Sequence, residues 1–353
     1  MKREQLQSGK NKRPVRCAAI LTAAVMLFSL FGMVPVSASG DRVLLYPGGM
    51  PFGVRFFVNG VLVVGFADEE GGREANPAAK AGIRIGDVIT GINGKTVEGA
   101  DHLSKLVADS GGKEITVTLT RDTRTMTMKL TPSGSAGKYR TGVWVRDSGA
   151  GIGTVTFLTS DGTTFAGLGH GICDTDTGKL IPMKRGSITG VTVSQIVRGQ
   201  PGTPGEIKGY FGAEKIGALI GNSHCGVFGM LTEKPANIPE GPFPVAKPEE
   251  VRAGDAYIWC TMNAGEPQKY AVKLSAIDCS ATGNKCFTVT ITDPKLLEVS
   301  GGIVQGMSGS PIIQDGRFVG AVTHVLINDP TTGYGIFITN MLREVPEILR
   351  KAA

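Results

Sequence analysis

Gly306-Met307-Ser308-Gly309-Ser310-Pro311 is the stretch of sequence on which the interpretation of this chain depends. A serine between glycines can occupy a tight turn, and the missing side chains let the backbone approach a ligand closely. Two short apolar runs of β type follow it, at residues 311–313 and 318–324. The pattern therefore predicts a turn that projects the Ser308 hydroxyl and leads into a pair of strands.

The region around this turn, residues 141–353, is rich in glycine and in short β-type runs. Examples are residues 153–158, 190–197 and 287–291, whereas a helical period is clear only in the last segment, at 339–350. A region of this length with mostly β structure is typical of a double barrel or a large sandwich.

A serine nucleophile needs a general base, and the chain contains only four histidines: His102, His170, His224 and His324. His170 lies in Gly167-Leu168-Gly169-His170-Gly171-Ile172, a predicted strand that runs into a glycine turn. His324 lies on a strand after the serine, where a packing or specificity role is expected. His224 is next to Cys225, and adjacent strand residues point to opposite faces, so they are not expected to form a pair.

This serine motif resembles the Gly-Asp-Ser-Gly-Gly-Pro motif of trypsin-like peptidases, in which the histidine also precedes the serine. The backbone amides of Gly306 and Ser308 could then stabilise an oxyanion. The acid that orients the histidine is not fixed by spacing, because Asp174, Asp176, Asp255, Asp278 and Asp293 all qualify. Asp174 and Asp176 beside His170 could instead suggest a metal site. Such a site needs more ligands than the nearby sequence supplies, so no metal or other cofactor is expected.

Residues 40–132 predict a separate small α+β domain, followed by a small-residue linker at 133–140. The motifs Ala81-Gly82-Ile83, Gly86-Asp87-Val88-Ile89 and Ile92-Asn93-Gly94 resemble those of bacterial protease-associated PDZ domains. PDZ domains bind an extended peptide by adding it as a strand to a free sheet edge. By this resemblance the peptide site would be formed by Phe52, Gly53 and Val54, opposite a helix that carries His102. An ordinary surface position for His102 is the alternative.

Residues 1–39 have the features of an export signal. Six basic residues precede an apolar run from 17 to 34 and the small-residue pattern Pro35-Val36-Ser37-Ala38, after which a signal peptidase could cut. An uncleaved segment that anchors the protein in the membrane is the other interpretation.

The net charge of +6 comes almost entirely from this terminus. Residues 1–38 hold six of the 37 basic residues and one of the 31 acidic residues, which leaves 31 and 30 in the remainder. The body of the protein is close to neutral, so no nucleic-acid partner is expected.

Five of the six cysteines lie beyond the N-terminal segment. Cys279 and Cys286 could bridge a hairpin in an oxidising compartment. The odd number leaves at least one free thiol.

Together the signal segment, the PDZ-like module and the motifs around His170 and Ser308 resemble the SpoIVB peptidase family. The stretch Thr292-Asp293-Pro294-Lys295-Leu296-Leu297 is similar to that family too. The resemblance implies a serine endopeptidase with His170 as base, Ser308 as nucleophile and Asp293 as third residue. Its fold would be a PDZ domain at 40–132 followed by a trypsin-like double β-barrel at 141–353.

The resemblance also implies a role in endospore formation. Members of the family are exported from the forespore into the space between the two membranes around it. There they cleave themselves and a membrane-bound regulator of an intramembrane metalloprotease, which triggers processing of a mother-cell sigma factor precursor. The partners implied are therefore a peptide or protein substrate and a peptide ligand of the PDZ module.

Two other classes of function are compatible with the sequence. The chain could be a catalytically silent binding protein whose PDZ module is the functional part, although Ser308 and His170 are both intact. It could also be a quality-control protease of the cell envelope, which expression in vegetative cells would favour.

Overall fold

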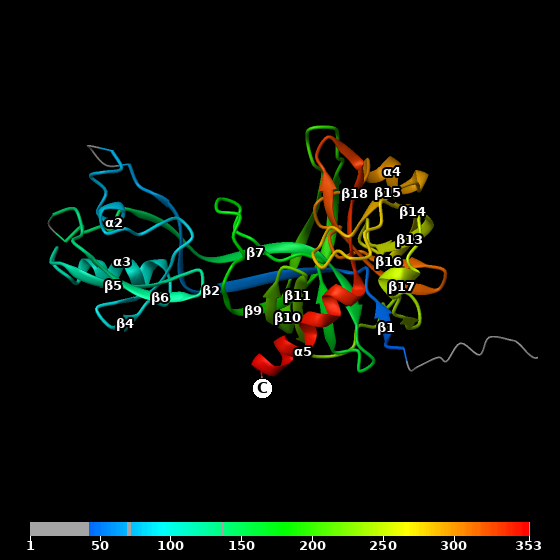
Figure 1. The fold of residues 1–353 in the computed structure, drawn as a ribbon, viewed down its shortest axis with the longest axis horizontal. Coiled ribbons are helices and arrows are strands. Elements are labelled where there is room, and N and C mark those ends of the chain that lie inside the picture. The colour runs from blue at the N-terminus through cyan, green and yellow to red at the C-terminus, as the bar shows by residue number, and fades with distance from the viewer. Residues whose placement is uncertain (1–41, 69–71, 136, 353) are drawn as a thin grey trace, which may run out of the picture. The chain divides into compact units, whose positions relative to one another are not determined.

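The computed structural model describes residues 42–68, 72–135 and 137–352. The predicted export signal lies outside these residues. Strands dominate the described chain, and Figure 1 shows their arrangement. The first group is β1 (Leu44–Pro47), β2 (Pro51–Phe66), β7 (Val143–Leu158), β8 (Thr164–Gly167), β9 (Met183–Val197), β10 (Glu206–Ser223), β11 (Gly226–Leu231) and β12 (Phe243–Pro244). The second group is β13 (Gly254–Cys260), β14 (Gln268–Ser275), β15 (Phe287–Ile291), β16 (Pro311–Gln314), β17 (Arg317–Leu326) and β18 (Asp329–Phe337).

Each group contains a closed barrel. In the first group the strands pair in the order β7-β8-β11-β10-β9-β2, and an additional pairing between β7 and β2 closes the ring. In the second group the closed order is β13-β14-β15-β18-β17-β16. The double β-barrel predicted from the sequence is confirmed. Helix α4 (Pro294–Ser300) precedes the serine turn, and α5 (Ile338–Ala352) ends the described chain.

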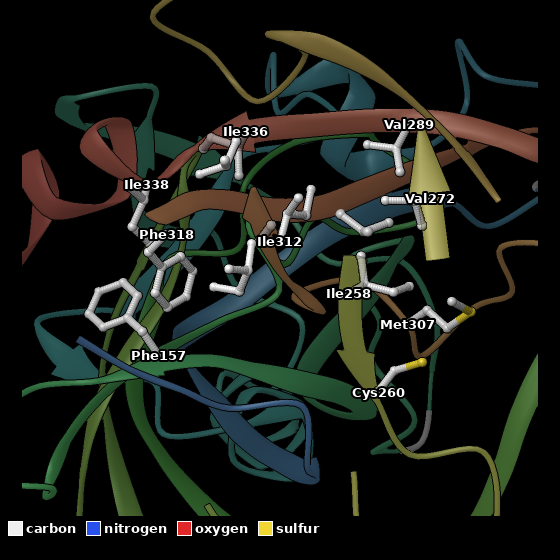
Figure 2. Close-up of a cluster of buried hydrophobic side chains, with 14 of the residues drawn as sticks. Phe157, Ile258, Cys260, Val272, Val289, Met307, Ile312, Phe318, Ile336 and Ile338 are labelled. Atoms are coloured by element: carbon white, nitrogen blue, oxygen red, sulfur yellow. The ribbon is translucent and has the colours of Figure 1, made fainter. Parts of the chain in front are cut away.

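The second barrel encloses a large apolar core because its strands alternate between inward and outward residues. In β14, Tyr270, Val272 and Leu274 are buried while the residues between them are exposed. Figure 2 shows part of this core, in which Phe318 of β17 and Phe157 of β7 meet edge to face with ring centroids 6.5 Å apart. The two rings therefore join the strands of the two barrels.

A smaller domain with its own core lies between β2 and β7 in the chain. It contains α2 (Pro77–Lys80), β3 (Val88–Ile92), β4 (Lys95–Thr96), α3 (Ala100–Ala108), β5 (Ile115–Arg121) and β6 (Arg124–Leu130). Asn76 caps α2 by accepting hydrogen bonds from the amides of Ala78 and Ala79. Asn93 and Gly94 have φ angles of 48° and 77°, as a tight two-residue turn with positive φ at both positions requires.

The order of these domains differs from the prediction of a PDZ domain at 40–132, a linker at 133–140 and a peptidase domain from 141. Residues 51–58 of β2 pair with β7 and β9 and thus belong to the first barrel. Near Gly60, which has a φ of 101°, the register with β7 shifts and the strand continues into the small domain as residues 61–66. The small domain is therefore an insertion between two strands of the first barrel. Figure 1 shows these two strands, β2 and β7, side by side.

The two ends of the region predicted as a linker are joined by hydrogen bonds. Ser133 and Arg140 exchange backbone hydrogen bonds of 2.9 and 2.8 Å, which close a turn before β7 begins.

We predict that Phe318→Ala destabilises the protein by about 3–5 kcal/mol, because the ring is fully buried and its loss leaves a cavity. Urea unfolding followed by tryptophan fluorescence measures the change. Tyr210→Ala is the control: that side chain is 74% exposed, and its loss should change stability by less than about 0.5 kcal/mol. Equal effects of the two substitutions would contradict the assignment of Phe318 to the core.

Candidate active site

The turn that carries Ser308 is held by β7. The amide of Thr154 donates to the Ser308 carbonyl at 3.0 Å, and the Thr154 hydroxyl donates to the Gly306 carbonyl at 2.7 Å. Gly309 has a φ of 98°, and a Cβ there would lie 2.1 Å from the Thr154 carbonyl oxygen. Glycine is thus required at position 309 both by its backbone angle and by the close approach of β7.

The carbonyls of this turn are used, whereas two of its amides are free. Within the described residues the backbone N–H groups of Gly306 and Ser308 donate no hydrogen bond to protein atoms. By contrast, the amide of Met307 donates to the carbonyl of Val304, and the amide of Gly309 donates to the carbonyl of Val322. Two unused donors on either side of a residue can together stabilise a negatively charged oxygen.

His170 reaches the same place from the first barrel. The chain leaves β8 through Leu168 and Gly169, which have φ angles of 68° and 67°. The Leu168 amide donates to the Thr154 carbonyl at 3.2 Å. One residue of β7 therefore anchors both the serine turn and the loop that carries the histidine.

The hydrogen bond and the lowered pKa of His170 suit a general base. The Nδ1 atom of His170 lies 2.9 Å from the Gly171 carbonyl oxygen. A carbonyl only accepts, so Nδ1 carries the proton and Nε2 is left with its lone pair. Burial lowers the pKa of His170 below its ordinary value, and the bond to Gly171 offsets part of this shift.

Ser308 and His170 line one cavity of about 400 Å³. The Ser308 hydroxyl donates to the Thr323 carbonyl at 2.6 Å. No hydrogen bond joins Ser308 to His170 in the described chain, so the hydroxyl must turn away from Thr323 before its proton can pass to the histidine.

His324 lies close to His170, and the centroids of the two rings are 5.0 Å apart. Burial and the neighbouring His170 lower the pKa of His324 to about 4, so it is neutral at physiological pH.

The structure does not bring Asp293 to His170, and the prediction of Asp293 as third residue is not met. Its carboxylate caps helix α4 by accepting from the amides of Lys295 and Leu296 at 3.0 and 3.2 Å. Its second oxygen accepts from the Ala271 amide at 3.2 Å. An aspartate before a proline at a helix start is the usual N-cap arrangement. In the described chain the hydrogen-bond partner of His170 is a backbone carbonyl.

Three of the four other aspartate candidates are engaged away from His170, and the fourth, Asp255, is exposed on β13. Asp174 is buried and forms an ion pair with Arg146, which also binds Asp176 at 2.8 Å. The carboxylates of Asp174 and Asp176, which suggested a metal site, are thus paired with the guanidinium group of Arg146. Asp278 accepts from the amide and hydroxyl of Ser280.

Asn222 is a residue that the sequence analysis missed. Its side chain bonds both the amide and the carbonyl of Ile172, at 2.8 and 2.9 Å, and also the carbonyl of Ile181 at 3.1 Å. It thereby fixes the segment that follows His170. A polar residue near the end of a strand gives no sequence signal for this role, because its partners lie 41 and 50 residues away.

The predicted peptide site at Phe52, Gly53 and Val54 is wrong. Phe52 pairs with Gly153 on β7 and with Gly190 on β9, and Val54 likewise has partners on both strands. A strand paired on both edges cannot accept a peptide by strand addition. Phe52 is also 1% exposed and packs against Phe165 in the core of the first barrel.

A groove of about 240 Å³ instead lies between α3 and the start of β7. Leu103, Ser104 and Val107 line it from the helix, and residues 139–145 line it from the other side. There β7 pairs with β2 along one edge, and no described strand pairs with its other edge. His102 does not line this groove, and its Nδ1 atom is buried without a described partner.

The turn before β7 offers free backbone donors at this groove. The carbonyls of Thr141 and Gly142 accept bonds from the amide of Ala78 and the side chain of Asn76. The amides of Thr141 and Gly142 donate none within the described residues. Gly142 has a φ of 80°, and successive free amides in such a turn can bind an anion.

All five cysteines of the described chain are thiols, and the bridge considered between Cys279 and Cys286 is not formed. Cys286 is buried and Cys279 is exposed. Cys173 lies beside the cavity of Ser308 and His170, and burial raises the pKa of its thiol.

The family described as SpoIVB peptidase S55 matches residues 137–342, more than half of the chain and both residues of the site. The chain belongs to the SpoIVB peptidase S55 family. A PDZ domain matches residues 71–121, within the inserted domain.

More local similarity exists to curated proteins named probable periplasmic serine endoprotease DegP-like. Those of Brucella suis biovar 1 and Brucella abortus biovar 1 are each 33% identical over 97 residues, which is 26% of this chain. The chain spans only 19% of the length of these relatives.

Among solved structures, the active form of the Rv3671c protease from M. tuberculosis is 13% identical, with a TM-score of 0.34 over 57% of this chain and 74% of that one. Deg5 is 15% identical, with a TM-score of 0.34 over 56% of this chain and 84% of that one. In the part of the chain that the structure describes, no helix is both long and apolar enough to span a membrane.

We predict that the acidic limb of the pH profile of kcat/KM lies below pH 6.5, the ordinary pKa of histidine. A lowered pKa keeps the His170 imidazole neutral, and thus able to accept a proton, to lower pH. Peptide hydrolysis measured from pH 4.5 to 8 gives the limb. His224→Ala, which removes an exposed histidine, should leave it unchanged. A limb above pH 6.5 would contradict this environment.

Proposed function

We propose that the protein is a serine endopeptidase in which Ser308 is the nucleophile and His170 the general base, with the amides of Gly306 and Ser308 as the oxyanion hole. The observation that carries the proposal is that both side chains line one cavity although they come from different barrels. A half-buried neutral histidine beside a serine in a glycine turn, with two unused amides, has the parts that acyl transfer needs.

The mechanism follows from these positions. Nε2 of His170 takes the proton of the Ser308 hydroxyl as its oxygen attacks the peptide carbonyl carbon, and the carbonyl oxygen becomes negative between the amides of Gly306 and Ser308. Collapse of this intermediate breaks the C–N bond, and His170 gives its proton to the leaving amine. Water then attacks the acyl-enzyme by the same steps and restores Ser308. The Gly171 carbonyl holds the Nδ1 proton of His170 throughout.

The inserted domain acts in this proposal as the module that binds a peptide by its C-terminus. The peptide would add to the free edge of β7 in the groove beside α3. Its carboxylate would meet the amides of Thr141 and Gly142, and an apolar last side chain would meet Leu103 and Val107. This site replaces the one predicted at Phe52–Val54.

The proposed biological role is that of an exported protease of endospore formation. It would cleave itself and a membrane-bound regulator of an intramembrane metalloprotease, in the space between the forespore membranes, and so trigger processing of a sigma factor precursor. Membership of the SpoIVB peptidase family supports this role. The N-terminal segment would direct export or serve as a membrane anchor.

A second candidate, a quality-control protease of the cell envelope, is favoured by the local similarity to periplasmic DegP-like endoproteases. Expression confined to sporulating cells would speak for the first role, and expression in vegetative cells for the second.

The catalytic assignment is tested by labelling the full-length protein with a fluorophosphonate probe and mapping the adduct by mass spectrometry. We expect an adduct on Ser308 that disappears in Ser308→Ala and falls at least about 100-fold in rate in His170→Ala, since a general base contributes on that order. His224→Ala is the matched control and should label normally. Full labelling of His170→Ala, or full proteolytic activity of Ser308→Ala, would exclude the scheme.

The groove is tested with Ser104→Phe, which places a ring into it from an exposed helix position. We expect binding of a fluorescent peptide with a free apolar C-terminus to weaken at least tenfold, because the added ring occupies the space of its last side chain. Lys105→Phe, at the adjacent exposed position outside the groove, should bind as the unchanged protein does. Fluorescence anisotropy measures both, and equal affinities of the two variants would place the peptide elsewhere.

A further inference from the structure

The cavity that contains Ser308 and His170 has an apolar wall. Val54 and Phe56 of β2, Ile152 of β7, and Leu168 and Ile172 on either side of His170 line it. None of the described residues that line this cavity is an aspartate, glutamate, lysine or arginine. A charged side chain placed here would lose water and gain no counter-ion, which is strongly unfavourable.

The wall is rigid before any substrate binds. Val54 and Phe56 are 2% and 5% exposed, and they pack in the core of the first barrel together with Leu168. Their strand is paired on both edges along this stretch. A site whose apolar lining is already ordered loses little conformational freedom when a ligand side chain enters it.

Glycines of β7 make room for this wall. A Cβ at Gly149 would lie 2.4 Å from the tip of the Phe56 ring, and a Cβ at Gly153 would lie 2.0 Å from a methyl group of Leu168. The absence of side chains at these two positions lets Phe56 and Leu168 lie against the backbone of β7. The run from Gly149 to Gly153 thus shapes the cavity.

Gly151 affects the cavity in a different way from Gly149 and Gly153. It lines the cavity, is exposed, and a Cβ at this position would meet no atom within 4 Å. Its φ lies outside the left-handed region, so a larger residue is not strained there. Glycine at position 151 is therefore not needed by the fold, and its effect is to leave the space beside the wall open.

We propose that this cavity is a specificity subsite that binds an apolar side chain, branched aliphatic or aromatic, of a residue adjoining the scissile bond. The inference rests on the catalytic roles proposed for Ser308 and His170, and it adds the chemical class of the substrate. A cavity of about 400 Å³ has room for a branched aliphatic or aromatic side chain. A side chain with a carboxylate or an ammonium group is excluded because no described lining residue can pair with it.

The subsite is tested on the full-length protein with a library of internally quenched peptides varied on both sides of the cleaved bond. Mass spectrometry of the products locates the cleavage sites. We expect one position adjoining the bond to favour Leu, Ile, Val or Phe over Asp and Lys by at least about tenfold in kcat/KM, as discrimination in an apolar pocket allows. Equal use of charged and apolar residues there would overturn the proposal.

Gly151→Val narrows the space beside the wall without backbone strain. We expect it to lower kcat/KM at least about tenfold for peptides with Phe at the preferred position and to spare those with Ala. The matched control is Gly190→Val on β9, where a Cβ also meets no atom within 4 Å but the residue does not line the cavity. It should leave the preference unchanged. An equal loss for all peptides in Gly151→Val, or the same shift in Gly190→Val, would contradict the subsite.

Labelling of Ser308 by a small fluorophosphonate separates the two proposals. If Gly151→Val labels normally and its peptide preference shifts, both proposals stand. If the unchanged protein labels at Ser308 but shows no apolar preference, the subsite is wrong and the catalytic assignment remains. If Ser308 is never labelled and no peptide is cleaved, the catalytic assignment fails and the subsite fails with it.

Discussion

Three hydrogen bonds of Thr154 hold together the two halves of the site. Its amide and hydroxyl bind the carbonyls of Ser308 and Gly306, and its carbonyl binds the amide of Leu168. Thr154 is 2% exposed, so these bonds form away from water, where an unmade bond is costly. The serine turn belongs to one barrel and the histidine loop to the other. The geometry of the pair thus depends on a β7 residue that need not itself touch the substrate.

The same strand also takes part in the connection between the inserted domain and the first barrel, which is not a single flexible linker. β2 and β7 each begin in one domain and end in the other, and they pair with one another in both. The register shift near Gly60 marks the change from barrel to insertion. Two paired strands form a stiffer connection than a single flexible linker of small residues, because the ladder bonds restrain both backbones.

Local signals in the sequence predicted much of this structure. The serine turn and helix α3, which carries His102, are each specified by residues close together in the chain. The position of His170 was predicted as well, since a glycine-rich turn after a strand is a local pattern. These elements need no knowledge of distant partners.

What sequence reasoning missed depends on distant pairing. Phe52 resembles part of a peptide-binding edge as long as its strand partners are unknown. Those partners, Gly153 and Gly190, lie 101 and 138 residues further along the chain. Asp293 fits a family motif, but its carboxylate is used by a helix start and by Ala271 on a neighbouring strand. The sequence around an aspartate does not show whether its carboxylate caps a helix or orients a catalytic histidine.

The position of the insertion also has a consequence for how the chain is made. β2 is the first strand of its barrel to leave the ribosome, yet β7 follows only after the whole small domain, and the ring closes only once β9, β10 and β11 exist. Until then its apolar residues 52–58 present unpaired backbone edges, which favour wrong strand pairing. A small domain that folds early and holds residues 61–66 in its own sheet would keep the other end of this strand in place. In that sense the insertion can serve as an internal folding template for the barrel that contains it.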